Sequence, residues 1–301
     1  MRHISQPSGN NKLGCLEMAS LKILSPKKIR EALKERNLAP RKSLGQNFLI
    51  DSNVLMKIVE AGSVNDGDLV LEIGPGLGAL TGFLLEQAGK VVAVEYDRGL
   101  FSILEERFKE SPRLQLLNRD IMETDLFELV KGFEVGLKVV ANLPYYITTP
   151  AIFKLVESGI EWERMVFLVQ KEVAQRITAG PGTKEYGALT VMLNFYGKVE
   201  KVGNVSRTVF YPEPGVDSAI VRITPYRAQE IQSLYPRLSL VVQAAFQQRR
   251  KTILNALAST NLFQSKDELG IFLRTKGIDP NRRGETLSVV EFRSLAEGLG
   301  F

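Results

Sequence analysis

Five short apolar segments recur at regular intervals through the first half of the chain, and helix-like segments separate them. They are Leu69–Ile73, Val91–Val94, Leu114–Leu117, Lys138–Ala141 and Met165–Val169. Strands that helices cover on both faces read as nearly continuous apolar runs, because neither face meets water. Such strands alternating with helices predict an α/β fold with a mostly parallel, doubly wound sheet.

The segments between and after these strands predict the rest of the sheet domain. Helical patterns cover 80–87, 99–108, 151–157 and 189–196. In the last of them, apolar residues recur at the i, i+3, i+4, i+7 spacing of a helix face. Two late strands, at 199–205 and 219–223, are expected to pair antiparallel because the chain between them is too short for a helical crossover.

The chain of 301 residues predicts one large domain and one small one, since single cores stop growing at roughly 250–300 residues. We expect the sheet domain to cover residues 21–226. Residues 227–301 predict a small all-α domain, with helices at 238–246, 250–257, 266–272 and 288–299. Residues 1–20 are expected to be a disordered extension; an upstream start codon, with Met18 as the true initiator, is the alternative. These residues also lack the apolar region of a secretory signal.

Cysteine and histidine each occur once, as Cys15 and His3. This excludes a disulfide framework, a Cys/His zinc site and a histidine-based nucleophilic centre, so no metal is expected. No run approaches the roughly 18 apolar residues of a membrane span. We therefore expect a soluble, cytoplasmic protein.

Basic residues are concentrated near the N-terminus. Between residues 22 and 42 eight lysines and arginines stand against two glutamates, which more than accounts for the net charge of +5. A local basic patch of this kind suits a phosphate backbone. A solvated helix face with i,i+4 ion pairs is the alternative interpretation.

A glycine-rich turn follows the first strand, at Glu72–Ala79, and the missing Cβ of Gly74 would let a ligand approach the backbone. Glu95 ends the second strand, where a carboxylate can accept hydrogen bonds from both hydroxyls of a ribose. Asp120 follows the third strand and suits an adenine amino group, or alternatively a helix N-cap before Ile121. These features predict a nucleoside cofactor without specifying which one.

Asn142–Tyr145 follows the fourth strand, in the crevice where such sheets bind ligands. An adenine amino nitrogen is a poor nucleophile because its lone pair is delocalised into the ring. Hydrogen bonds from its N–H groups to the Asn142 side chain and the Leu143 carbonyl would expose that lone pair, and Tyr145 could stack on the base. An Asn-Pro turn with a buried tyrosine is the structural alternative.

Together with three further motifs, these residues resemble the ribosomal RNA adenine-N6,N6-dimethyltransferases of the small-subunit (16S), kasugamycin-resistance type. The further motifs are Ser43–Leu49, Phe210–Ser218 and Ala245–Thr252. The resemblance covers nearly all of the chain after residue 22. It implies a Rossmann-like methyltransferase sheet, with S-adenosylmethionine as the methyl donor.

The resemblance also assigns roles to individual residues. It implies that the S-adenosylmethionine site is lined by Asn47, Leu49, Gly74, Glu95, Asp120 and Asn142. The catalytic set would be Asn142, Leu143, Tyr145 and Phe210, with Phe210 stacking on the extruded adenine opposite Tyr145. Contacts to RNA are expected from Lys27, Lys28, Arg41, Lys42, Arg249, Arg250 and Lys251.

The implied reaction is dimethylation of two adjacent adenines in the 3′-terminal hairpin loop of 16S rRNA, within a pre-30S particle and by a monomeric enzyme. A close alternative is a large-subunit adenine methyltransferase of the macrolide-resistance group, which shares the fold. A nicotinamide-dependent dehydrogenase fits the glycine turn and Glu95 but leaves Asn142–Tyr145 without a role. A ribosome-assembly factor without catalytic activity is the third alternative.

Overall fold

The computed structural model describes residues 25–41, 44–134, 136–226, 229–260 and 262–299. The expected N-terminal extension, Lys42 and both Cys15 and His3 lie outside the described residues. The chain forms two compact units. One comprises the residues up to Lys171 together with Val202–Arg222, and the other comprises Glu172–Lys201 together with the residues from Ile223 onward.

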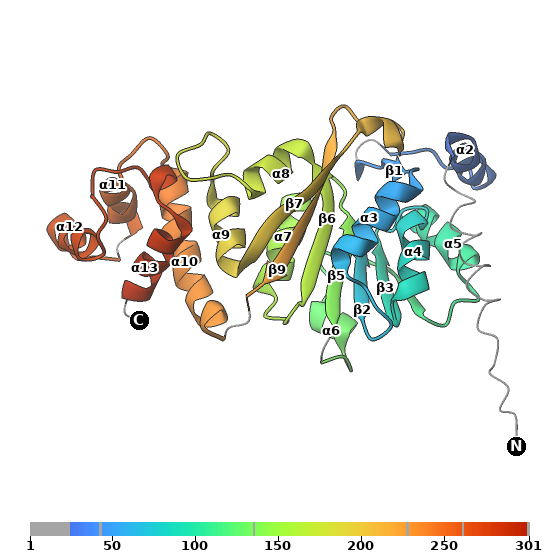
Figure 1. Cartoon of the computed structure of the whole chain (residues 1–301), viewed down its shortest axis with the longest axis horizontal. Coiled ribbons are helices and arrows are strands. Elements are labelled where there is room, and N and C mark those ends of the chain that lie inside the picture. The colour runs from blue at the N-terminus through green and yellow to red at the C-terminus, as the bar shows by residue number, and fades with distance from the viewer. Residues whose placement is uncertain (1–24, 42–43, 135, 227–228, 261, 300–301) are drawn as a thin grey trace, which may run out of the picture. The chain divides into compact units, whose positions relative to one another are not determined.

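A seven-stranded sheet confirms the predicted doubly wound α/β fold (Figure 1). Its strands are β2 (Leu69–Ile73), β3 (Lys90–Glu95), β4 (Leu114–Asn118), β5 (Leu137–Asn142), β6 (Arg164–Gln170), β7 (Gly197–Val205) and β9 (Ser218–Pro225). Their order is β4-β3-β2-β5-β6-β9-β7, and the pairs from β4 to β6 are parallel. The order reverses between β2 and β5, which is where such sheets bind ligands.

The first unit contains a helix before its first strand and further helices between its strands. They are α2 (Pro26–Glu35), α3 (Ser52–Gly62), α4 (Ala79–Gln87), α5 (Arg98–Arg107), α6 (Leu126–Val130) and α7 (Thr148–Glu157). One fully buried cluster contains a valine from each of three strands, together with Ile58 of α3 and Leu84 of α4. The valines are Val70 of β2, Val140 of β5 and Val166 of β6. This face of the sheet is therefore covered by α3 and α4, as a doubly wound fold requires.

The predicted strands from 69 to 169 are all present, with bounds that agree to within a residue. A second, two-stranded sheet was not predicted: β1 (Phe48–Leu49) pairs antiparallel with β8 (Phe210–Tyr211). Two residues are too few for a period-2 pattern to be visible, and the partners lie far apart in the chain. This strand pair joins the segment before α3 to the segment after β7.

The second unit contains helices that overlap the predicted ranges and a helix, at residues 171–177, that was not predicted. They are α8 (Lys171–Ile177), α9 (Ala188–Tyr196), α10 (Gln229–Gln247), α11 (Ile253–Leu257), α12 (Lys266–Thr275) and α13 (Val289–Gly298). The helix expected from residue 250 begins at Ile253, because the Thr252 hydroxyl caps it by accepting a bond from the Asn255 N–H. Arg249 and Arg250 therefore lie in a turn instead of a helix.

The division into units differs from the single boundary expected between residues 226 and 227. Helix α9 packs against α10 and α13 within the second unit, so α9 groups with the C-terminal helices. No helix in the described part of the chain is long and apolar enough to cross a membrane.

A buried ion pair joins the beginning of β5 to the loop before β2. The Lys138 ammonium, only 1% exposed, lies 2.7 Å from an Asp68 carboxylate oxygen and donates to the Ser63 carbonyl oxygen at the same distance. The same Asp68 oxygen accepts from the Asn65 N–H. These bonds hold together the two strands between which the sheet order reverses.

Replacing Lys138 with methionine is expected to destabilise the protein by about 3–5 kcal/mol, because it leaves the Asp68 carboxylate buried without its countercharge. Urea unfolding of Lys138→Met and wild type measures the difference. The exposed Lys131→Met is the matched control and should change stability by less than about 0.5 kcal/mol. Equal effects of the two substitutions would show that the buried pair does not stabilise the sheet.

Candidate functional site

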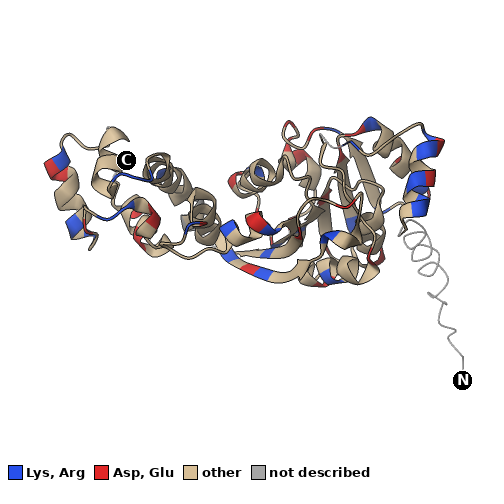
Figure 2. Ribbon diagram, turned by 90° about the horizontal axis from the view of Figure 1, so that it is seen from above, with Lys and Arg blue, Asp and Glu red and all other residues tan. Residues whose placement is uncertain are grey.

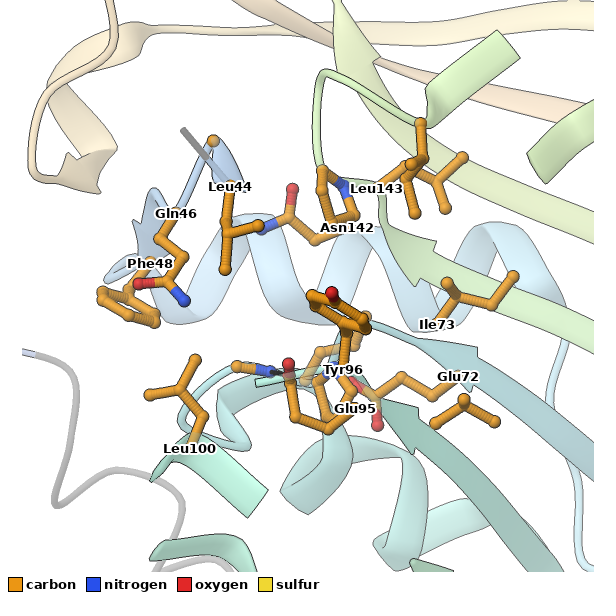
Figure 3. A pocket seen from close by; sticks show the side chains of 18 of the residues that line it. Leu44, Gln46, Phe48, Glu72, Ile73, Glu95, Tyr96, Leu100, Asn142 and Leu143 are labelled. Atoms are coloured by element: carbon orange, nitrogen blue, oxygen red, sulfur yellow. Dashed lines mark hydrogen bonds between the residues drawn. The ribbon is translucent and has the colours of Figure 1, made fainter. Parts of the chain in front are cut away.

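A pocket opens at the carboxyl ends of β2, β3, β4 and β5 (Figure 3). Its volume is about 1080 Å³ with the open mouth included, and its lining combines apolar side chains with a few polar groups, as is typical of a ligand site. All the residues predicted for the cofactor line this pocket, and so do three of the four predicted catalytic residues. These are Asn47, Leu49, Gly74, Glu95, Asp120, Asn142, Leu143 and Tyr145.

The glycine turn between β2 and α4 forms one wall of the pocket. Gly74 has a φ of +66°, a conformation that residues with a Cβ rarely adopt. Its N–H donates to the Val94 carbonyl at 3.0 Å, which ties the turn to the end of β3. A Cβ on Gly74 would lie 3.3 Å from the Pro144 ring. The glycine therefore keeps the gap to the Asn142–Tyr145 segment open.

Glu95 is held in place by backbone donors at the end of β3. One of its oxygens accepts from the Asp97 N–H at 2.8 Å, and the other accepts from the Gly76 N–H at 3.0 Å. Burial raises the pKa of Glu95 to about 7, although these backbone hydrogen bonds act in the opposite direction. The carboxyl group is thus oriented toward the pocket before any ligand arrives.

Glu72 is a second buried carboxyl group in the pocket wall, and the sequence analysis assigned it no role. It is 1% exposed, and its Oε2 atom has no hydrogen-bond partner among the described residues. Burial raises its pKa to about 8, and the nearby charge of Glu95 adds to the increase. An unpaired polar atom at this position is free to meet a ligand.

Asp120 lines the pocket beyond the end of β4. One of its carboxylate oxygens accepts from the Met122 N–H at 2.8 Å, so the side chain holds a turn at residues 121–123. Asp120 therefore caps a turn and not a helix. The same residue also lines the pocket wall.

Asn142 is the last residue of β5, and its side chain is anchored from the opposite wall. Its Nδ2 donates to the Asn47 carbonyl oxygen at 3.4 Å. Because the amide nitrogen is turned toward Asn47, the Oδ1 atom remains as an acceptor on the same group. The following residue is fixed by the Leu143 N–H, which donates to the Leu168 carbonyl at 3.2 Å.

Phe210 is not among the residues that line the pocket. Its ring is 4% exposed and packs in the same core cluster as Val70 and Val140. The residue lies on β8 opposite Leu49, and this pairing places it beside the β1 strand. The structure therefore separates Phe210 from the other three predicted catalytic residues.

The predicted RNA-contacting residues fall into two groups. Lys27 and Lys28 are exposed on α2, where basic side chains gather (Figure 2), although Lys27 lies 4.0 Å from Glu31. Arg41 instead pairs with the buried Asp97 at 3.1 Å. Lys42 lies outside the described residues.

In the second unit, Arg249 donates to the carbonyl oxygens of Lys184 and Tyr186 and pairs with Glu285 at 3.3 Å. Its guanidinium is thus engaged within the protein. Arg250 and Lys251 are exposed.

Several pocket residues were given no role from the sequence, Gln46 and Tyr96 among them. Gln46 lies in the Ser43–Leu49 motif and donates from Nε2 to Asp97 at 3.2 Å, and Tyr96 stands exposed directly after Glu95 (Figure 3). Their proximity to Asn47 and Glu95 in the chain was the available signal. Among the described residues no cluster of His, Cys, Asp and Glu suits a metal ion.

Comparison with known sequences covers nearly the whole chain. The family model described as ribosomal RNA adenine dimethylase matches residues 37–299. Ribosomal RNA small subunit methyltransferase A of Moorella thermoacetica is 46% identical over 288 residues, which cover 92% of this chain and 98% of that protein. The protein of the same name from Alkaliphilus oremlandii is 42% identical over 284 residues, with the same two coverages.

Solved structures show the same likeness. A dimethyladenosine transferase from Plasmodium falciparum superposes with a TM-score of 0.70 at 30% identity, covering 82% of this chain and 95% of that one. The 23S rRNA methyltransferase ErmE superposes with a TM-score of 0.63 at 26% identity, covering 84% of this chain and 99% of that one.

Replacing Glu72 with glutamine is expected to stabilise the ligand-free protein more as the pH rises. An unfolded glutamate ionises near its ordinary pKa of 4.5, whereas the folded group ionises near 8. Between these values the folded state holds the extra proton, so wild-type stability falls as pH rises through this window. Glutamine does not titrate, and thermal unfolding at pH 5 and pH 8 compares the two proteins. A difference in unfolding temperature, variant minus wild type, that is smaller at pH 8 than at pH 5 would contradict the assignment.

Proposed function

The chain belongs to the ribosomal RNA adenine dimethylase family, and we propose that it dimethylates the N6 amino groups of two adjacent adenines in the 3′-terminal hairpin loop of 16S rRNA. It is an S-adenosylmethionine-dependent ribosomal RNA adenine dimethyltransferase. Relatives at 42% and 46% identity are named for the small subunit, which favours this RNA over that of the large subunit.

The polar lining of the pocket suits S-adenosylmethionine. Three carboxyl groups line it, those of Glu72, Glu95 and Asp120. Burial disfavours the charge of Glu72 and Glu95 in the empty pocket, and the positive sulfonium centre of the cofactor would favour their ionised form. When bound, the cofactor supplies an activated methyl group. Glu95 would accept from the ribose hydroxyls and Asp120 from the adenine amino group.

The remaining cofactor contacts would come from the two walls that face each other. Gly74 would admit the ligand close to the backbone of the glycine turn, where a Cβ would approach Pro144. Asn47 and Leu49 would close the pocket from the segment before α3, since both line it. Asn142 would belong to this site and to the target site at once.

The anchored amide of Asn142 is the observation that carries the proposed chemistry. Its Nδ2 is occupied by the Asn47 carbonyl, so its Oδ1 would accept from the target amino group. The Leu143 carbonyl would accept from the second N–H. Both bonds favour a tetrahedral nitrogen with an exposed lone pair, so catalysis rests on orientation and electrostatics. The proton can leave after the methyl group has been transferred.

Tyr145 would stack on the extruded base, a contact worth roughly 1–3 kcal/mol. Phe210 would form the second aromatic surface. Because the Phe210 ring packs in the core, this role requires β8 to expose the ring when RNA binds. The proposed role of Phe210 rests on the resemblance to the family.

We further propose that the substrate is small-subunit rRNA within a pre-30S particle, that the enzyme acts as a monomer, and that it acts in the cytoplasm. Exposed Lys27, Lys28, Arg250 and Lys251 would contact phosphates. Arg41 and Arg249 would contribute less, because Asp97 and Glu285 already pair with them.

Asn142→Ala is expected to lower methyl transfer to under-methylated small subunits by about 10²–10³, the usual cost of losing one preorganised hydrogen-bonding group. Transfer of labelled methyl groups measures the rate, and filter binding measures RNA affinity, which should survive. The exposed Asn53→Ala serves as the matched control. When wild type is given small and large subunits together, label found only in large-subunit RNA would overturn the proposed function. Loss of RNA binding together with transfer would make Asn142 structural.

Substituting Lys27 and Lys28 together with alanine is expected to reduce the salt dependence of RNA binding. Each lysine that contacts a phosphate should lower the slope of log affinity against log salt by about one. Binding titrations at several salt concentrations measure the slope, with exposed Lys109→Ala as the control. Unchanged slopes would place the RNA elsewhere on the surface.

A further inference from the structure

The last residue of the Phe210–Ser218 motif, and not the first, contacts a residue of the pocket wall. The Ser218 Oγ lies 3.1 Å from the Tyr145 hydroxyl oxygen, within hydrogen-bond distance. Phe210, at the other end of the motif, is buried in the core. The motif therefore acts on the base-binding wall of the pocket through the Tyr145 hydroxyl.

The position of Ser218 is fixed by its burial and by the hydrogen bonds of the residue before it. Ser218 is fully buried as the first residue of β9. The residue before it is held on both its backbone and its side chain: the Lys171 N–H donates to the Asp217 carbonyl at 2.9 Å, and the Arg207 N–H donates to an Asp217 carboxylate oxygen at 3.1 Å. A hydroxyl fixed in this way can hold a partner in one orientation.

The backbone around Tyr145 is also fixed, and its ring is the part that needs an anchor. The Pro144 carbonyl accepts from the Ile147 N–H at 3.1 Å and from the Thr148 hydroxyl at 3.0 Å. Tyr145 itself is half-buried, whereas the neighbouring Tyr146 is 49% exposed. The bond to Ser218 distinguishes the two adjacent tyrosines of this loop.

We propose that Ser218 is a positioning residue that holds the Tyr145 ring in the orientation in which it stacks on the target adenine. The inference rests on the proposed function and deepens it. A ring ordered in advance does not have to lose its freedom of rotation when the base arrives, so more of the stacking interaction is available for binding and orientation.

The test is a double-mutant cycle with Tyr145→Phe, Ser218→Ala and both together. Each single variant removes the hydrogen bond, and Tyr145→Phe keeps the aromatic ring. We expect each to lower kcat/KM for small-subunit RNA about three- to tenfold, the net effect of one hydrogen bond. The double variant should be no worse than either single variant, because the two hydroxyls act as one unit.

Cofactor affinity separates positioning from a general structural role. Calorimetric titration with S-adenosylmethionine should give an unchanged Kd in all three variants, because neither hydroxyl is assigned to that site. Ser158→Ala is the matched control: it removes a partly buried serine hydroxyl bonded to the Leu155 carbonyl, and it should leave kcat/KM unchanged.

Effects that add in the double variant, or an unchanged kcat/KM in Tyr145→Phe, would overturn the proposal. A loss of cofactor affinity parallel to the loss of rate would overturn it as well. If Ser218→Ala does not fold, Tyr145→Phe alone decides by the same criteria. Wild-type transfer to small-subunit RNA shows that the proposed function stands even where this inference fails.

Discussion

The parallel pairing of β2 with β5 is the constraint on which the site depends. In the sheet Leu69 lies opposite Leu137 and Leu71 lies opposite Val139, and the strand order reverses at this pair. Their carboxyl ends therefore lie side by side, which places the glycine turn next to Asn142. The buried Lys138–Asp68 pair secures the opposite ends of the same two strands. A shift in this register would separate the cofactor wall from the catalytic wall.

The pocket is built at a cost to the stability of the folded chain. Burial raises the pKa of both Glu72 and Glu95 far above the ordinary value, so each carboxyl group resists ionisation at neutral pH. A core that served only stability would hold apolar groups at these positions. Retaining carboxyl groups where burial disfavours their charge is typical of a site prepared for a positively charged or hydrogen-bonding ligand.

Much of the fold was predictable because its signals are local. The apolar strands, the glycine turn and the carboxylates at strand ends each occupy a few consecutive residues, and the doubly wound topology brings them to one edge. Contacts between distant segments were not predictable. Tyr145 and Ser218 are separated by 73 positions, and β1 and β8 are too short to show a pattern. The burial of Phe210 and the internal pairing of Arg41 and Arg249 likewise depend on tertiary packing.

This pocket is proposed to direct methyl groups to adenine N6 in small-subunit RNA. Mass spectrometry of rRNA nucleosides and fragments, after reaction of the protein with a mixture of under-methylated small and large subunits, tests this most directly. We expect N6,N6-dimethyladenosine at two adjacent positions of the 3′-terminal hairpin loop. Methylation at another base atom, or dimethyladenosine confined to large-subunit RNA, would contradict the proposal.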